Sequence, residues 1–312
     1  MAGSSLGLAV SMRGWTRARG GAWPSEQVAP ELRLGVHWNS PLSRQGVPEY
    51  TEYLAQQAHR SALARPDAVR AAVVARDRDA LTHELDVVPW EQTVQLPLGV
   101  VTPGAVDFSS VRSHYGVPGE IEGARVLDLN PGDGYWAFEF ERRNAIVSAL
   151  RAPKVSDLDL PAWIDTEAVP DRPLSAGFAL AHAALDSVVQ EIDLGIGDLD
   201  IDSVGCFDVV HCRDVLAYRS DPVGMVQSIR SVTKQSALFS ERVATCTSPL
   251  GRTYVHTVLG IEPGAWFIPT VETLTRQVLD GGFSRVEVVG AFGLHSSRRP
   301  VRRTFCNVLA WP

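Results

Sequence analysis

The sequence predicts an α/β protein with a mainly parallel sheet that is covered by helices on both faces. Three observations lead to this prediction. Short apolar segments alternate with helical stretches after Gly123, a turn with two glycines follows the first apolar segment, and an Ala- and Leu-rich helical stretch precedes both. Strands joined through helices are typical of parallel sheets, because a parallel pair needs a long crossover connection.

The composition is that of a globular protein. The chain has 312 residues, of which 45% are hydrophobic and 21% charged, which excludes wholesale disorder and a fibrous repeat. Its 29 basic and 36 acidic residues give a formal charge of −7, which argues against a broad nucleic-acid-binding surface. The mean hydropathy of −0.01, without any uncharged stretch of about 18 residues, excludes a membrane-spanning protein.

The cysteines and the N-terminus favour a cytoplasmic location. The four cysteines are scattered and form no CxxC pair, so neither a disulfide framework nor a zinc site is expected. The arginines near the N-terminus lack the apolar core of a signal peptide. We therefore expect reduced thiols and no metal.

The chain divides into three parts. Residues 1–46 are rich in Gly, Ser, Pro and Arg, which favours an irregular tail. Residues 47–119 contain helical spacing of apolar residues, interrupted at Pro66, and then the loop-rich string LPLGVVTPG. Residues 120–312 form the predicted α/β domain.

Within the α/β domain, the last two strands have no helix between them and should form an antiparallel hairpin. Its loop is expected to contain Arg298, Arg299, Arg302 and Arg303. Strands are predicted over 124–129, 206–212, 237–243, 285–289 and 304–310, and helices over 175–188, 222–233 and 270–282.

The segment VLDLNPGDGYWAFEFERR is the most informative part of the chain. Its strand ends at Asp128, its turn contains Gly132 and Gly134, and a helix follows from near Tyr135. Glycines allow a tight turn and let a ligand approach the backbone closely. The spacing fits two cofactor classes, a dinucleotide and S-adenosylmethionine, and it also fits a turn that binds no ligand.

Charge favours S-adenosylmethionine over a dinucleotide. Asp128 and Asp133 place carboxylates where a pyrophosphate would lie, and like charges repel. The ammonium group of S-adenosylmethionine would instead attract a carboxylate, so we expect Asp128 to face the cationic end of this ligand.

Several strings, in the same order along the chain, resemble those of class I S-adenosylmethionine-dependent methyltransferases. The branch that looks closest contains the tRNA wobble-uridine carboxymethyltransferase and its small-molecule-modifying relatives. The likeness covers most of residues 90–290 and implies a Rossmann-like seven-stranded sheet with helices on both faces, preceded by a helical extension. The strings are LPLGVVTPG, GARVLDLNPGDGYWAFEFERRNA, FDVVHCRDVLAYRSDP, VRSVTKQSALFSE, and WFIPT with a later GGF.

The resemblance implies that S-adenosylmethionine is the cofactor and assigns residues to each part of it. Those near its methionine end are Asp128, Asn130, Gly132, Gly134, His211 and Cys212, those near the adenine are Asp198 and Leu199, and Asp159 is implied at the ribose hydroxyls.

The chain departs from the family pattern in three places. Asn130-Pro131 replaces the glycine that usually opens the turn, and Ala217-Tyr218 stands where the branch usually has Tyr-His. The ribose-binding acid is expected about 20 residues after Asp128, but Arg151 lies there. Asp159 would fit if the first helix extended through NAIVSALRA.

Methyl transfer from a sulfonium is an in-line displacement that requires alignment and, for a hydroxyl acceptor, a base, but no metal. Asp214, Tyr218 and Glu241 are the catalytic candidates, with His182 and His256 as further bases. Each has a structural alternative: Asp214 as a helix cap, Tyr218 as a hydrogen-bond donor because its ordinary pKa is about 10, Glu241 as a strand-end residue, and His182 as a packed helix residue. Trp163 and Trp266 either shape an acceptor pocket or pack in the core.

We therefore expect methylation of a small molecule, at a hydroxyl of a natural product or sugar. Three alternatives remain: a catalytically degenerate methyltransferase-fold binding or partner protein, a tRNA-modifying methyl or carboxymethyl transferase, and an NAD-dependent oxidoreductase. The charge of −7 argues against the tRNA alternative, which only the arginine cluster at 298–303 favours.

Overall fold

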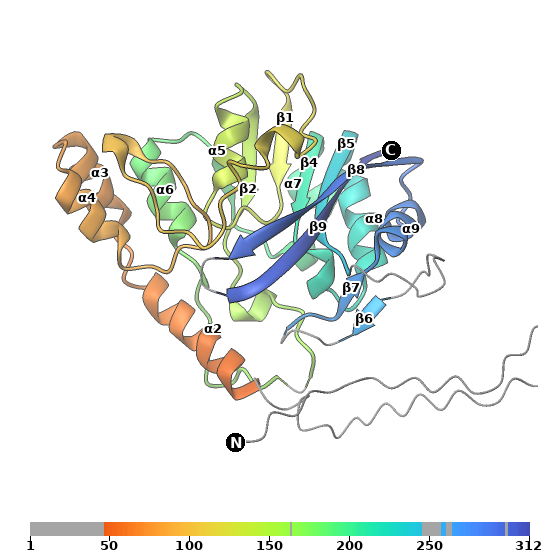
Figure 1. Cartoon of the computed structure of the whole chain (residues 1–312), viewed down its shortest axis with the longest axis horizontal. Coiled ribbons are helices and arrows are strands. Elements are labelled where there is room, and N and C mark those ends of the chain that lie inside the picture. Colours follow the sequence, from red (N-terminus) through yellow and green to blue (C-terminus); the bar gives the residue numbers. More distant parts are fainter. Residues whose placement is uncertain (1–46, 163, 245–256, 260–263, 297–298) are drawn as a thin grey trace, which may run out of the picture. The chain divides into compact units, whose positions relative to one another are not determined.

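The computed structural model describes residues 47–162, 164–244, 257–259, 264–296 and 299–312. Its centre is a seven-stranded sheet of order β3-β2-β1-β4-β5-β9-β8, and two short strands pair separately (Figure 1). The strands of the large sheet are β1 Arg125–Asp128, β2 Ile146–Leu150, β3 Gln190–Ile192, β4 Phe207–Arg213, β5 Thr233–Arg242, β8 Arg285–Ser296 and β9 Arg299–Trp311, and the separate pair is β6 Thr257–Leu259 and β7 Phe267–Pro269.

The strand directions confirm the mixed sheet with a reversed strand near one edge. Strand β1 runs parallel to β2 and β4, and β4 runs parallel to β5. Strand β9 is antiparallel to both β5 and β8. Because consecutive strands β1, β2 and β3 run outward to one side and β4 begins on the other side of β1, the order reverses between β1 and β4.

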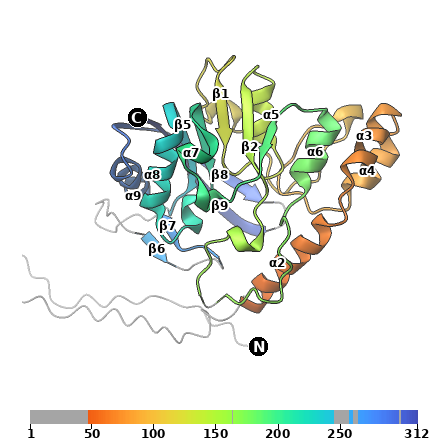
Figure 2. The same cartoon turned by 180° about the vertical axis from the view of Figure 1, so that it is seen from behind.

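Helices cover both faces of the sheet, and alternate strand residues supply the two cores (Figures 1 and 2). Val126, Val209 and Leu238 face the layer of α5 Tyr135–Glu141 and α6 Gly177–Leu185. Leu127, Val210 and their neighbours face α8 Pro222–Val232 and α9 Val271–Asp280. This alternation is the period of two expected for strands buried on both faces.

The helical extension packs directly on the first of these cores. It contains α2 Val47–Ser61, α3 Pro66–Val74 and α4 Arg78–Leu85, so the predicted interruption at Pro66 is confirmed. Leu81, Leu85 and Trp90 are buried with Val126 in one apolar cluster. The boundary between 119 and 120 therefore stays a prediction, and the predicted tail over 1–46 lies outside the described residues.

The first helix does not extend through NAIVSALRA, which was the condition under which Asp159 would match the ribose position. These residues contain strand β2 instead. The helix α5 ends at Glu141, and Asn144 then takes a left-handed conformation with φ of 60°. The β-branched Ile146 and Val147 follow in extended conformation, which suits their restricted side chains.

The predicted antiparallel hairpin is confirmed, but its strands are longer than expected. Strand β8 continues to Ser296 and β9 begins at Arg299. Arg302 and Arg303 therefore belong to a strand rather than to a loop, and Arg298 lies outside the described residues. Within the described part of the chain, no helix combines the length and the apolar character that a membrane span requires.

Candidate cofactor and acceptor site

The turn between β1 and α5 requires both of its glycines. Gly132 and Gly134 have φ angles of 58° and 97°, in the left-handed region that favours glycine. A Cβ on Gly134 would lie 2.2 Å from the ring of Phe138. A Cβ on Gly132 would lie 2.3 Å from Nε2 of Gln92 and 2.8 Å from Nη2 of Arg213. Side chains from two other segments therefore cover this turn.

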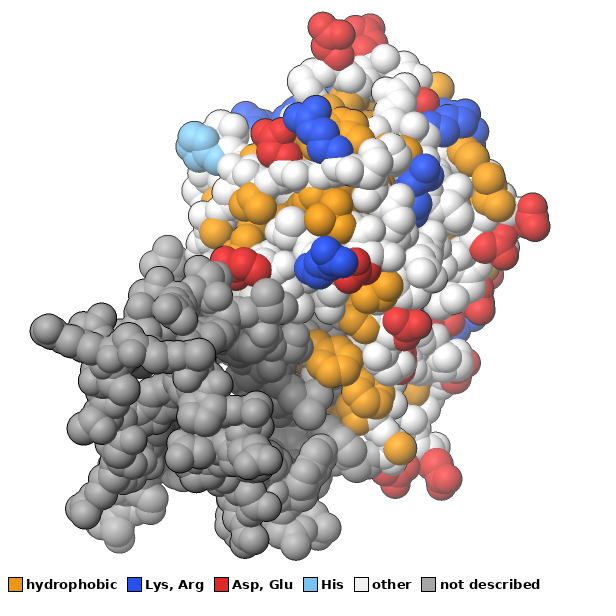
Figure 3. Space-filling view, turned by 90° about the vertical axis from the view of Figure 1, so that its right-hand side faces the viewer, with side chains coloured by type: hydrophobic (Ala, Val, Ile, Leu, Met, Phe, Trp, Pro, Cys, Tyr) orange, Lys and Arg blue, Asp and Glu red, His pale blue; other side chains and the backbone are white. Residues whose placement is uncertain are grey.

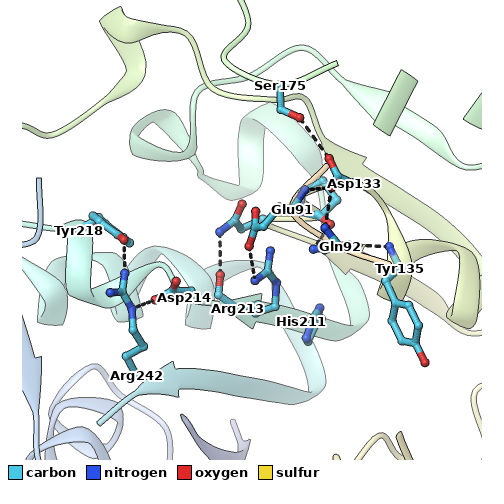
Figure 4. Close-up of polar contacts among 12 residues, drawn as sticks. Glu91, Gln92, Asp133, Tyr135, Ser175, His211, Arg213, Asp214, Tyr218 and Arg242 are labelled. Carbon is cyan, nitrogen blue, oxygen red and sulfur yellow. Dashed lines mark hydrogen bonds and ion pairs between the residues drawn. The ribbon is translucent and has the colours of Figure 1, made fainter. Parts of the chain in front are cut away.

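The connector that precedes the sheet is bonded to the turn and to the start of α5 (Figure 4). Gln92 donates from Nε2 to the carbonyl oxygen of Pro131, at 3.0 Å, and accepts from the Tyr135 N–H, at 2.9 Å. Sequence reasoning placed no functional residue here. The string LPLGVVTPG, only a few residues further on, was the signal that pointed to this segment.

The side chain of Asp133, in the turn, also accepts hydrogen bonds from the connector. Its Oδ2 accepts from the backbone N–H groups of Glu91 and Gln92, at 2.6 and 2.7 Å, and its Oδ1 accepts from the Ser175 hydroxyl, at 3.2 Å. Burial, together with the negative charge of Glu91, raises the pKa of Asp133 to about 7.

Asp128, the acid at the end of β1, is bonded to a histidine of the neighbouring strand. Its side chain is fully buried, and Oδ1 lies 3.0 Å from Nδ1 of His211. The Nε2 atom of His211 lies 3.0 Å from the Tyr115 hydroxyl, so the three side chains form a buried chain of hydrogen bonds. The reason is the parallel register of β1 and β4, which places Asp128 beside His211. Oδ2 of Asp128 is buried and has no hydrogen-bond partner among the described residues.

Arg213, the last residue of β4, carries the positive charge nearest the turn. Only 3% of it is exposed, and its Nη1 donates to Oε1 of Glu91 at 3.3 Å (Figure 4). Its guanidinium carbon lies 5.5 Å from the ring centre of Phe108. Asn130 donates from its side-chain nitrogen to the carbonyl oxygen of Arg213, at 2.9 Å, which ties the turn to this strand end.

Glu241, one of the catalytic candidates, caps the short helix that follows β4. Its carboxylate accepts from the N–H groups of Val215 and Leu216 at 3.1 Å and from the Cys212 thiol at 3.3 Å. The cap was the structural alternative for Asp214, but Glu241, from a neighbouring strand, accepts these N–H groups instead. Burial and the nearby charge of Asp214 raise the pKa of Glu241 to about 8.

The other two catalytic candidates are joined through an arginine that sequence reasoning missed. Arg242 donates from Nε to Oδ1 of Asp214, at 2.6 Å, and from Nη2 to the Tyr218 hydroxyl (Figure 4). Its guanidinium carbon also lies 4.8 Å from the ring centre of Tyr218. Asp214 has a positive φ of 52°, so the chain bends sharply at the end of β4 to bring these groups together.

Tyr50 of α2 and Trp266 lie at the same side of the site. A Cβ on Gly264 would lie 2.6 Å from the Tyr50 hydroxyl, and Trp266 donates its backbone N–H to the carbonyl oxygen of Ala217, at 2.8 Å. Burial raises the pKa of Tyr50 to about 12, opposed by the charge of Arg242. The side chain of Trp266 donates to the carbonyl oxygen of Asp159 at 2.7 Å.

The acids assigned to the nucleoside lie beyond β2 and β3. A Cβ on Gly195 would lie 2.9 Å from Oδ1 of Asp157 and 3.1 Å from Oδ2 of Asp198, so these two carboxylates approach each other there. Asp159 accepts through Oδ2 from the N–H and the hydroxyl of Ser220, both at 2.7 Å. A cavity of about 230 Å³ lies beside them and is lined by Asp159, Gly197, Arg219, Asp221, Gly224, Met225 and Ser228.

Arg151 occupies the end of β2, where the resemblance implies a ribose-binding acid. Its Nη1 lies 2.5 Å from Oδ2 of Asp157, and it also forms an ion pair with Asp193. The hydrogen bond from Arg151 lowers the pKa of Asp157, which therefore stays ionised. Asp159, rather than the residue that follows the strand, lines the cavity.

Three other predicted residues do not line the cavity beside Asp159. Leu199 and Cys212 are buried in the core that includes residues of α8. His182 bonds through Nε2 to the carbonyl oxygen of Val189, just before β3 begins, and lines a separate cavity of about 260 Å³. The packed role of His182 is thus confirmed. Trp163 and His256 lie outside the described residues.

Comparisons with known proteins show which proteins this chain resembles. No protein-family model matches the chain. Curated proteins similar in sequence include a tRNA U34 carboxymethyltransferase of Campylobacter lari, 24% identical over 171 residues, and one of Sulfurimonas denitrificans, 26% identical over 192 residues. These alignments cover 54% and 59% of this chain and 53% and 55% of the relatives, so the chain spans about half of their length.

Among solved structures, the N-terminal domain of EvdMO1 with SAH (S-adenosylhomocysteine) bound is similar, with a TM-score of 0.51 and 16% identity. The match covers 76% of this chain and 96% of that domain. The sheet order with a reversed strand is the same arrangement as in methyltransferases. The chain has the class I S-adenosylmethionine-dependent methyltransferase fold.

The residues at the carboxyl edge of this methyltransferase fold suit S-adenosylmethionine at both of its ends. Arg213, paired with Glu91, places a cation beside the glycine turn, and Asp159 places a carboxylate beside a cavity. Arg151 is the exception, because the resemblance implies an acid at its position and a guanidinium is not one. The fit therefore depends on residues other than the strand-end acid of β2.

Proposed function

We propose that this chain transfers a methyl group from S-adenosylmethionine to a small molecule, at a hydroxyl of a natural product or sugar. The main support is the position of the glycine turn. It lies at the carboxyl ends of β1 and β4, between which the strand order reverses. Open α/β sheets bind their ligands at such a switch point, because the loops diverge there and leave a crevice.

In this proposal the donor lies along the carboxyl edge of the sheet. The backbone of Gly132 and Gly134 and the side chain of Asn130 flank its methionine end. Asp159 and Asp198 lie toward its nucleoside. When bound, S-adenosylmethionine would supply an electrophilic methyl group on a sulfonium, and the chain would supply alignment with the acceptor.

The acceptor would lie beside Tyr218 and Arg242. The Tyr218 oxygen accepts a hydrogen bond from Arg242, so the two side chains form one polar group beside which an acceptor hydroxyl could lie. The half-buried rings of Tyr50 and Trp266 offer apolar contact on the same side. Glu241 is not a base in this proposal, since its carboxylate already accepts two backbone N–H groups.

A small molecule fits the charge of the protein better than a tRNA does. The net charge is −7, and the side of the molecule seen in Figure 3 shows acidic and basic side chains interspersed among the described residues. A tRNA-binding surface would need a continuous basic face. The tRNA-modifying alternative is kept because two curated relatives are named for that activity.

A non-catalytic binding or partner protein is the second candidate. Two observations favour it: Gln92 and Arg213 cover Gly132, and Arg151 replaces the usual acid at the end of β2. The proposal places the protein in the cytoplasm.

Calorimetric titration of the full chain with S-adenosylmethionine and with S-adenosylhomocysteine tests the proposal. Binding of both, with micromolar dissociation constants, is the expected result. Incubation of the protein with methyl-labelled donor and either a hydroxylated small-molecule library or bulk tRNA then separates the acceptor classes. Failure to bind either ligand would contradict the proposal, and binding without transfer to any acceptor would favour the non-catalytic candidate.

A further inference from the structure

We propose that Arg213 binds the amino-acid carboxylate of the donor, and that Glu91 forms an ion pair with Arg213 when no donor is bound. This inference rests on the proposed function and gives the side chain of Arg213 a role, whereas the sequence resemblance implies only a backbone contact at this strand end. It also gives the connector a role in the site: one of its side chains must leave the arginine before the ligand can bind.

The position of Arg213 is the first argument. The side chain projects from the end of β4 over the glycine turn, where its Nη2 lies 2.8 Å from the place of a Cβ on Gly132 (Figure 4). The same strand end carries the carbonyl group that Asn130 binds. A ligand whose polar end approaches the backbone of this turn would therefore meet the guanidinium first.

The second argument is the charge balance of the edge. A buried cation is stable only with a nearby anion, and Arg213 is 3% exposed. Two other carboxylates of this edge already have partners, since Asp128 binds His211 and Asp214 binds Arg242. The partner of Arg213 is Glu91, through one bond of 3.3 Å.

The third argument is that Glu91 is suited to exchange. Its side chain is 53% exposed, so it can turn into water without the penalty of burying a charge. A ligand carboxylate can bind a guanidinium through two parallel hydrogen bonds, which is stronger than the single contact seen here. The backbone of Glu91 would stay in place, because Asp133 holds its N–H group.

The alternative is that the ion pair between Arg213 and Glu91 only holds the connector against the sheet. The two interpretations differ in what the arginine recognises. A carboxylate anchor discriminates S-adenosylhomocysteine from 5′-methylthioadenosine, which keeps the nucleoside and sulfur but lacks the amino-acid group. If the Arg213–Glu91 pair only held the connector in place, its loss would weaken the binding of both ligands equally, because a displaced connector would loosen the entire site.

The test is calorimetric titration of the full chain and its variants with these two ligands. Arg213→Met should weaken S-adenosylhomocysteine binding about 10- to 100-fold, the range expected for loss of a charged hydrogen bond, and should leave 5′-methylthioadenosine within about twofold. Arg213→Lys keeps the charge and should recover part of the affinity. Arg65→Met breaks an arginine–glutamate pair in the helical extension and should change neither.

Glu91→Gln gives an independent outcome. Removal of the competing carboxylate should tighten S-adenosylhomocysteine binding about threefold or more and leave 5′-methylthioadenosine unchanged. Thermal melting checks that each variant is folded. If Arg213→Met is unfolded, the comparison uses Arg213→Lys, which should still weaken the binding of S-adenosylhomocysteine alone.

The outcomes separate the two proposals. Equal weakening of both ligands by Arg213→Met, or no weakening of either, overturns the carboxylate anchor and leaves the proposed function intact. A looser complex of S-adenosylhomocysteine with Glu91→Gln overturns the exchange. If the unaltered chain binds neither ligand, the proposed function fails and this inference fails with it.

Discussion

Asp128 ends β1 and lies beside His211 of the neighbouring parallel strand β4, and a hydrogen bond of 3.0 Å joins Oδ1 to Nδ1 with both residues fully buried. Tyr115 continues this chain from the connector, and its ring stacks on Trp136 with the centres 3.8 Å apart. The strand-end acid of this methyltransferase fold therefore links the sheet to the connector.

Asp128→Ala should destabilise the protein by about 2–3 kcal/mol, because it leaves the buried Nδ1–H of His211 without an acceptor. Tyr115→Phe removes only the terminal hydroxyl and should destabilise it by about 1 kcal/mol. Urea unfolding of the three proteins measures both effects. Equal destabilisation by the two substitutions would mean that the Asp128–His211 bond adds nothing beyond local packing.

Gly132→Ala should be more destabilising than Gly123→Ala. Both glycines have positive φ, 58° and 69°, so each alanine carries the same backbone strain of about 1–2 kcal/mol. A Cβ on Gly123 meets nothing within 4 Å, whereas one on Gly132 meets Gln92. We expect a difference of at least about 1 kcal/mol in unfolding free energy. Similar values for both variants would show that Gln92 moves aside freely.

Asp133 should make stability depend on pH around neutrality. Its pKa is raised to about 7, so the folded protein binds this proton more tightly than the unfolded chain does. Stability from this group is present at low pH and decreases as the pH rises from about 4 to about 7, by up to about 1.4 kcal/mol per pH unit. The buried Glu241 titrates in the same direction, but it is common to both proteins in the comparison below.

Asp133→Asn removes that titration and keeps an acceptor for the backbone of Glu91 and Gln92. Between pH 5 and pH 8, urea midpoints of the unaltered protein should therefore fall more steeply than those of the variant. Parallel pH profiles would contradict the assignment of this titration to Asp133.

Asp159→Asn should weaken binding of S-adenosylhomocysteine about tenfold, since a neutral amide binds hydroxyl groups less strongly than a carboxylate does. Asp171→Asn is the matched control. Asp171 also accepts from the N–H and hydroxyl of a serine, Ser156, but it does not line the cavity beside Asp159. Calorimetry should show weaker binding for the Asp159 variant alone. Equal weakening by both substitutions would mean that the loss of affinity comes from loosening of the loops and not from a contact with the ligand.

The sequence allowed much of the fold to be predicted, because the relevant signals are local. The two glycines, the apolar strands and the terminal hairpin are each recognisable from a few adjacent residues. The sequence does not reveal strand β2, because five apolar or small residues, Ile146–Leu150, have no clear period at that length. For the same reason it does not reveal that Arg151 directly follows a strand.

The side-chain partners at the site were less predictable, because they come from distant segments. Asp214 has the local pattern of a helix cap, but Glu241, on the neighbouring strand, competes for the same N–H groups and prevails. Likewise, no sequence pattern near Gly132 predicts that the side chain of Gln92 lies against it. Parallel register sets these contacts, and register depends on the complete sheet.

The helical extension also determines how the protein can be shortened. Leu81, Leu85 and Trp90 cover the face of the sheet that includes Val126 and the helix residue Trp136. A fragment starting at residue 120 would expose this apolar face to water and should self-associate in solution. Studies of the isolated sheet therefore need the chain from α3 onward.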